Sequence, residues 1–109
     1  MAIRLPHGAA NLPAGDAAHA AFEAELLNEK VASLTRASRV AEKALADLAA
    51  FAGDIDGPEH DALCDAAAAR VWEYLVQREL CGFADTASVV SDLAVPPIVR
   101  KRLGVAKKR

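Results

Sequence analysis

The chain has 109 residues, which is the size of a single domain with a modest hydrophobic core. Hydrophobic residues make up 53% of it but aromatic residues only 5%, so alanine and other small side chains must supply most of the core contacts. The formal net charge of −2 provides no overall field that would draw the protein to nucleic acid or to a membrane surface.

The first 15 residues hold two prolines and two glycines without hydrophobic periodicity, and we expect a flexible lead there. From Asp16, a favourable N-cap, to Ala52 no proline or glycine interrupts the chain, which predicts one long helix. Apolar residues recur along it at alternating steps of four and three, broken at Ser38, as in a coiled coil. The larger members of this stripe are the candidate dimer interface: Leu27, Val31, Leu34, Leu45 and Leu48.

A second helix is predicted after a short loop. Pro58 suits its first turn, and Gly82 suits the position just beyond its last residue, Cys81. A short loop between two helices predicts an antiparallel hairpin. Because the first helix is the longer one, residues near its start such as Phe22 and Leu26 need cover from the C-terminal segments or from a second subunit.

The end of the second helix, "RVWEYLVQRELCGF", contains the only Trp and the only Tyr of the chain. Tryptophan, tyrosine and arginine dominate the binding energy of many protein interfaces. Four residues are therefore a candidate partner face: Arg70, Trp72, Tyr74 and Arg78. The simpler interpretation, which the sequence favours, is a core stripe that includes the dimer contact, beside a polar stripe.

Two short helices are expected next. Thr86 can cap a helix that runs to Leu93, and Pro97 can start a last turn or two that ends at Gly104. This order predicts one helical domain over residues 16–104, followed by a flexible basic tail over residues 105–109.

The C-terminal segment "VPPIVRKRLGVAKKR" carries an unusual share of the positive charge. All 15 acidic residues lie at or before Asp92, whereas six of the 13 basic residues lie after it. Those six are candidate contacts to a polyanion: Arg100, Lys101, Arg102, Lys107, Lys108 and Arg109. A helix-turn-helix is the sharper alternative, but the last helix is short and offers no Asn, Gln or Ser for base edges. A structural cap with a solvated end is the simpler interpretation.

The cysteines and histidines do not form a recognisable metal or catalytic pattern. Cys64 and Cys81 fall at opposite ends of one predicted helix, roughly 25 Å apart, so we expect free thiols and a reducing compartment. His60 and Cys64 are four residues apart, but a zinc site needs three or four ligands. The sequence therefore predicts no catalytic, cofactor-binding or metal-binding residue. With neither a signal peptide nor a membrane span expected, it predicts a cytoplasmic protein.

One resemblance bears on these expectations. The run "AAARVWEYLVQRELCGF", followed by "DLAVPPIVRKRLG", resembles a small bacterial family known only as a domain of unknown function. The likeness covers the last two helices and the alanine-rich helix before them, without the leading residues. It implies a small helical cytoplasmic protein and adds no activity, cofactor or catalytic residue.

These observations predict an all-α protein, an antiparallel helical hairpin with a short C-terminal helical cap that dimerises into a helical bundle. The expected function is that of a non-enzymatic interaction or scaffold protein, homodimeric and with an unidentified protein partner. The alternative is a nucleic-acid-associated regulator that uses the basic C-terminal segment. A helical-bundle enzyme or metal protein comes third.

Overall fold

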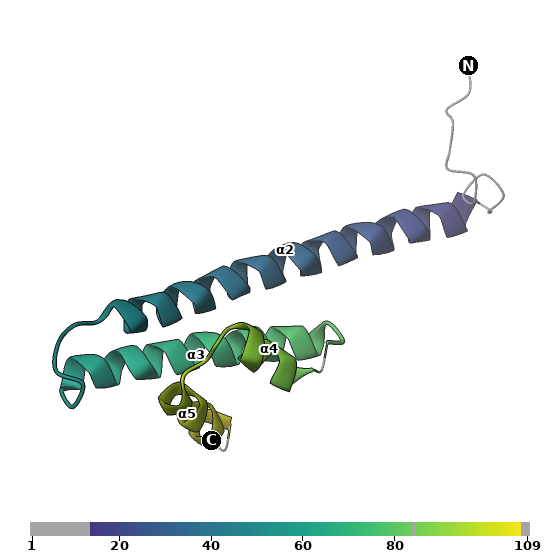
Figure 1. Cartoon of the computed structure of the whole chain (residues 1–109). Helices are drawn as coiled ribbons and strands as arrows, with labels where there is room; N and C mark the ends of the chain where they lie inside the picture. Colours follow the sequence, from purple (N-terminus) through teal and green to yellow (C-terminus); the bar gives the residue numbers. More distant parts are fainter. Residues whose placement is uncertain (1–13, 84, 108–109) are drawn as a thin grey trace. The chain divides into compact units, whose positions relative to one another are not determined.

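The computed structural model describes residues 14–83 and 85–107 of the chain. Their regular elements are α-helices: α2 (Ala14–Ala50), α3 (Pro58–Leu80), α4 (Thr86–Asp92) and α5 (Pro97–Lys107) (Figure 1). The predicted all-α class is thus confirmed. The chain divides into two compact units, Met1–Ala32 and Ser33–Arg109, with the boundary inside α2. The single domain expected over residues 16–104 stays a prediction, and most of the expected lead lies outside the described residues.

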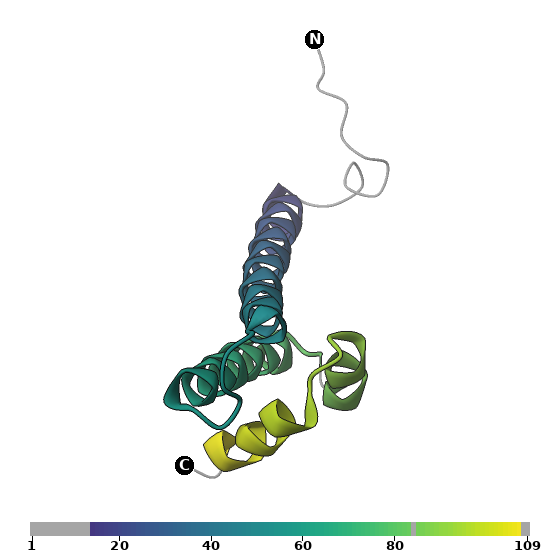
Figure 2. The same ribbon diagram turned by 60° about the vertical axis from the view of Figure 1, so that its left-hand side comes forward.

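The second unit is built on a helical hairpin. The trailing part of α2 and the whole of α3 run antiparallel, and a short loop joins them (Figures 1 and 2). Away from that loop, the Ser33 hydroxyl donates a hydrogen bond of 2.9 Å to Oε1 of Gln77. The last helix, α5, packs against α3.

Small side chains form the core of this unit. The largest side chains that are fully buried are those of Val71, Val99 and Cys64. Such side chains allow the backbones of α3 and α5 to approach closely, although each buries little apolar area. The buried residues come from all four helices and the linker before α5: Ala41, Leu48, Cys64, Ala67, Ala68, Val71, Leu75, Val89, Val95, Val99 and Leu103.

The first helix ends two residues earlier than expected, at Ala50. The Phe51 amide still donates a hydrogen bond to the Leu48 carbonyl at 3.2 Å, but the chain then leaves the helix. The Phe51 ring turns back over Gly53, where an added Cβ would come within 2.6 Å of the ring. Gly53 is therefore required for this close approach rather than for helix termination alone.

The boundary between α3 and α4 confirms one sequence signal and corrects another. Gly82 has φ +95°, and the Phe83 amide donates to the Arg78 carbonyl at 2.8 Å, which is the Schellman arrangement expected of a glycine at this position. The N-cap of α4, however, is Asp85 and not Thr86. Its carboxylate accepts a hydrogen bond of 3.1 Å from the Ser88 amide.

The end of α4 has the same arrangement without a glycine. Ala94 has φ +53°, its amide donates to Ser91, and the Val95 amide donates to Val90 at 3.2 Å. A left-handed conformation costs an L-residue roughly 1–2 kcal/mol. The conformation persists because Val95, the next residue, is buried in the core.

The last helix continues further than the sequence predicted. Glycine favours the position after a helix end, so Gly104 was expected to stop it, but α5 runs to Lys107. A glycine inside a helix costs only about 1 kcal/mol relative to alanine, which neighbouring hydrogen bonds can offset. Lys108 and Arg109 lie outside the described residues.

We predict that Ala94→Gly stabilises the protein by about 0.5–1 kcal/mol, because glycine removes the left-handed strain. Chemical denaturation would measure the change. Ala66→Gly is the matched control, since Ala66 is exposed in the interior of α3 and its replacement should cost about 1 kcal/mol. Equal destabilisation by both substitutions would contradict the prediction.

Candidate functional site

Large apolar side chains are exposed along the leading part of α2. Phe22 is 59% exposed, Leu26 44%, Leu27 59% and Val31 52%, and we call these four residues the leading apolar face. All four belong to the first unit, Met1–Ala32. Single exposed apolar residues are ordinary, whereas four large ones between Phe22 and Val31 of one helix form a candidate interaction surface.

The leading apolar face is wide and has charged side chains along its middle. At about 100° per residue, Phe22 and Leu26 form one edge of a half-circumference and Leu27 and Val31 form the other. Glu23 lies between these edges, and its Oε1 is 3.4 Å from Nε2 of His19. Lys30 lies on the same line as Glu23, two turns further along the helix.

The structure separates the five residues predicted as the dimer interface. Leu27 and Val31 are exposed, Leu34 is half-buried, and Leu45 and Leu48 pack in the core of the second unit. Leu48 is therefore already used within the chain. The predicted interface is exposed only in its leading part. Phe22 and Leu26, which the sequence analysis identified as needing cover, extend this exposed part.

A second group of side chains, in which Tyr74 and Arg78 are half-buried and Leu80 and Phe83 are exposed, lies at the end of α3. The guanidinium of Arg78 is 5.9 Å from the centre of the Tyr74 ring and 5.5 Å from that of Phe83, so cation–π contacts hold it between two rings. Leu80 beside them is 80% exposed. The sequence analysis did not include Phe83 in this group. It lies near Arg78 because the Schellman turn at Gly82 brings the chain back toward the end of α3.

The other two residues of the candidate partner face have different roles. Trp72 is half-buried and packs against the core cluster. Arg70 is exposed and forms an ion pair with Glu73 at 3.0 Å. The four predicted residues therefore differ in their exposure and contacts, and the partner face stays a prediction.

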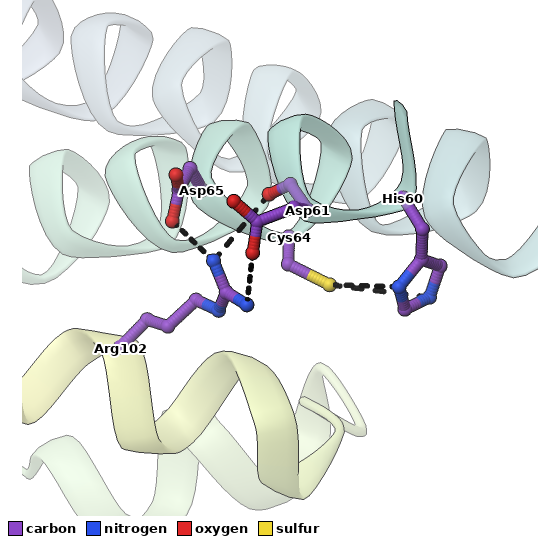
Figure 3. Close-up of polar contacts among 5 residues, drawn as sticks. All are labelled: His60, Asp61, Cys64, Asp65 and Arg102. Carbon is purple, nitrogen blue, oxygen red and sulfur yellow. Dashed lines mark hydrogen bonds and ion pairs between the residues drawn. The ribbon is translucent and has the colours of Figure 1, made fainter. Parts of the chain in front are cut away.

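Arg102 of α5 forms a two-carboxylate clamp with α3, which sequence reasoning did not find (Figure 3). Its Nη2 donates to Oδ1 of Asp61 at 2.7 Å, and its Nη1 donates to Oδ1 of Asp65 at 2.5 Å. Nη1 also reaches the Asp61 carbonyl at 3.4 Å. The available signal was the pair of aspartates one helical turn apart, but the sequence did not indicate which basic residue would meet them.

These contacts raise the pKa of Arg102 above the ordinary value of an arginine, mainly through the hydrogen bond to Asp61 and then through that to Asp65. A group whose pKa is higher in the folded state stabilises the protein at pH values below its unfolded-state pKa. This stability is lost only as the pH rises through the folded-state pKa. Both values lie above ordinary experimental pH. Arg102 therefore stays charged at ordinary pH, and its titration adds no pH dependence to the stability of the protein.

The clamp divides the predicted polyanion contacts. Arg102 is held by α3, whereas Arg100 and Lys101 are exposed. The side chains of Lys107, Lys108 and Arg109 lie outside the described part of the chain.

His60 and Cys64 lie beside the clamp, but they do not present a nucleophile to solvent. The Cys64 sulfur is 3.7 Å from Nδ1 of His60, and Cys64 has no exposed surface (Figure 3). The His60 ring also contacts the Phe51 ring, with centroids 5.6 Å apart. Among the described residues, no three His, Cys, Asp or Glu side chains are grouped so that they could hold a metal ion. The pair is therefore better explained as packing at the hairpin end.

Comparisons with known proteins give one match. The model of a family described as a family of unknown function (DUF6665) matches residues 3–109. The match includes the leading residues, to which the resemblance in the sequence had not extended. No curated protein and no solved structure matches the chain. None of the helices in the described residues has the length and apolar character needed to span a membrane.

We predict that Arg102→Ala lowers the free energy of unfolding by about 1 kcal/mol, because it removes two partly exposed ion pairs and the packing of the arginine stem. The loss should shrink at high salt, which screens the ion pairs. Denaturation at low and high salt would measure both effects. Lys101→Ala, an exposed neighbour, should change stability by less than about 0.5 kcal/mol; an equal loss in this control would contradict a specific role for the clamp.

Proposed function

The chain belongs to the DUF6665 family of unknown function, and for this member we propose a non-enzymatic role as a homodimeric interaction protein. The proposed contact between the two copies is the leading apolar face of α2. The second unit then acts as a folded helical body that the dimer presents to other molecules.

One observation carries this proposal, which is the exposure of Phe22, Leu26, Leu27 and Val31 on consecutive turns of one helix. Burying apolar surface contributes about 25 cal/mol per Å², so four such side chains offer a substantial driving force for association. A second copy supplies the same surface at the same concentration, and two-fold symmetric dimers are the commonest assemblies of this kind.

The free thiols support a cytoplasmic location as part of the same proposal. Cys64 is buried and Cys81 is half-buried, and neither is in a disulfide. A buried cysteine behaves as a small apolar residue and suits a compartment that keeps thiols reduced.

The polyanion-binding alternative receives less support from the geometry. Arg102, the central basic residue of α5, is engaged by Asp61 and Asp65. Its neighbours Arg100 and Lys101 are exposed, so the clamp removes one of the predicted phosphate contacts from this segment. We therefore favour a protein surface over a nucleic acid as the partner.

We predict that the protein is a dimer at micromolar concentration and that Leu27→Asp makes it monomeric, because an unpaired carboxylate in a packed apolar contact is strongly disfavoured. Light scattering with size-exclusion chromatography would measure the mass, and circular dichroism would show that the helices persist. Asn28→Asp adds the same charge outside the leading apolar face and should remain dimeric. A wild-type monomer at this concentration would overturn the proposed function.

We also predict no salt-dependent binding of DNA or RNA by the intact protein at physiological salt. Fluorescence anisotropy with a labelled duplex and a labelled single strand would test this over a salt series. Binding that falls steeply with salt and is lost in the double variant Arg100→Glu/Lys101→Glu would favour the nucleic-acid alternative instead.

A further inference from the structure

We infer that the end of α3 binds an acidic segment of another protein, and that the guanidinium of Arg78, positioned by the rings of Tyr74 and Phe83, holds one carboxylate of that segment. We call these three residues the Arg78 site. The inference rests on the proposed role as an interaction protein and names the chemistry of its partner. All three residues belong to the second unit, Ser33–Arg109, so the site does not include the leading apolar face.

Two aromatic rings position the guanidinium of Arg78. Its central carbon is 5.9 Å from the centre of the Tyr74 ring and 5.5 Å from that of the Phe83 ring. Tyr74 lies one turn before Arg78 on the same face of α3 and packs against the core cluster. The Phe83 amide donates a hydrogen bond of 2.8 Å to the Arg78 carbonyl, which fixes the second ring. An arginine held in this way loses less conformational freedom when it binds a ligand.

The donor groups of the Arg78 site remain available to a ligand. Within the described part of the chain, the Arg78 guanidinium has its two ring contacts but no ion pair or side-chain hydrogen bond. A ring face engages the positive charge without supplying the oxygen acceptors that the N–H groups can bind. The Tyr74 hydroxyl likewise has no hydrogen bond to a described residue, and it can serve as an additional donor.

Two neighbouring carboxylates already have other partners. Glu73 forms the ion pair with Arg70, and the Asp85 carboxylate accepts its hydrogen bond from the Ser88 amide. A carboxylate from outside the chain can therefore take the place that these two leave open. Arginine binds a carboxylate through two parallel N–H···O hydrogen bonds, a geometry that a planar guanidinium presents ready-made.

The charge around the site favours a single carboxylate over a polyanion. The stretch from Arg70 to Phe83 holds two arginines and two glutamates, so its net charge is zero. Both glutamates, Glu73 and Glu79, are exposed. A nucleic acid that ran past Arg78 would bring further phosphates toward these negative charges, whereas a short acidic segment needs only one positive charge.

The rings also determine what should stand beside the carboxylate. The Phe83 side chain is 49% exposed and Tyr74 is half-buried, so apolar surface adjoins the guanidinium. Tyrosine and arginine are enriched among the residues that dominate binding energy at protein interfaces. The partner should therefore carry an Asp or Glu next to an apolar side chain.

Two peptides that differ by one charge test the inference. The probes are acetyl-Leu-Glu-Leu-amide and acetyl-Leu-Gln-Leu-amide, titrated to about 10 mM into isotopically labelled full-length protein while NMR spectra are recorded. We expect the Glu peptide to shift the signals of the Arg78 side-chain N–H and the Phe83 amide, and to bind roughly fivefold or more tightly than the Gln peptide. Equal binding of the two peptides, or binding of neither, would overturn the inference.

Substitutions at Arg78 separate recognition from a general charge effect. Arg78→Gln should abolish the preference for the Glu peptide, and Arg78→Lys, which keeps the charge but not the planar fork, should reduce it to about twofold or less. Circular dichroism would check both folds, and the milder Arg78→Lys keeps the test decisive if Arg78→Gln unfolds. Arg39→Gln removes an exposed arginine of α2 and should keep the full preference. An equal loss in this control would reject the Arg78 site.

The remaining alternative is that the rings stack nucleic-acid bases. A labelled single-stranded oligonucleotide that shifts the same signals, binds more tightly than the Glu peptide and is weakened by Arg78→Gln would replace the acidic segment as the ligand and overturn the inference.

This inference and the proposed homodimer fail in different measurements. A wild-type dimer that binds neither peptide would retain the homodimer and reject only the Arg78 site. A wild-type monomer that binds the Glu peptide with the expected preference would reject the homodimer and retain the Arg78 site, because its residues lie outside the leading apolar face.

Discussion

The packing of α5 onto the small side chains of α3 is the contact on which the second unit depends. Val99 and Leu103 of α5 are buried in the same core cluster as Ala67, Ala68 and Val71 of α3, and the two helices pack against each other. Alanine on one helix leaves room for larger aliphatic residues on the other, and the aromatic side chains of Trp72 and Tyr74 pack against this cluster while only partly buried. The strained turn at Ala94 and the cap at Asp85 follow from it, because α4 and its linker must return the chain to α3 over few residues.

The same contact decides what the basic segment can do. Once α5 lies against α3, Arg102 faces Asp61 and Asp65 from the neighbouring helix and becomes part of the fold. Surface ion pairs of this kind add little stability individually, and the buried Val99 and Leu103 define the side of α5 that faces inward. The sequence suggested that the basic segment of α5 is a cationic surface, but part of it is a contact between two helices of the fold.

The leading part of α2 provides no residue of this core, and this is why we assign it the intermolecular role. Its large apolar side chains remain exposed over a half-circumference of the helix, with Glu23 and Lys30 between them. Such a surface costs free energy in water unless something covers it.

The sequence by itself determined the helices and most of their ends. Pro58, Gly82 and Pro97 mark boundaries through local backbone preferences, and hydrophobic periodicity acts within a few turns. The sequence could not show that Leu48 is buried and Leu27 exposed, because both lie on one apolar stripe. It also could not show that Arg102 and not its neighbour Lys101 forms the ion pairs. Only the tertiary structure buries Leu48, leaves Leu27 exposed and pairs Arg102 with carboxylates 37 and 41 residues earlier in the chain. Helix formation depends on neighbours within about four residues, whereas burial and ion pairing depend on which distant segments meet.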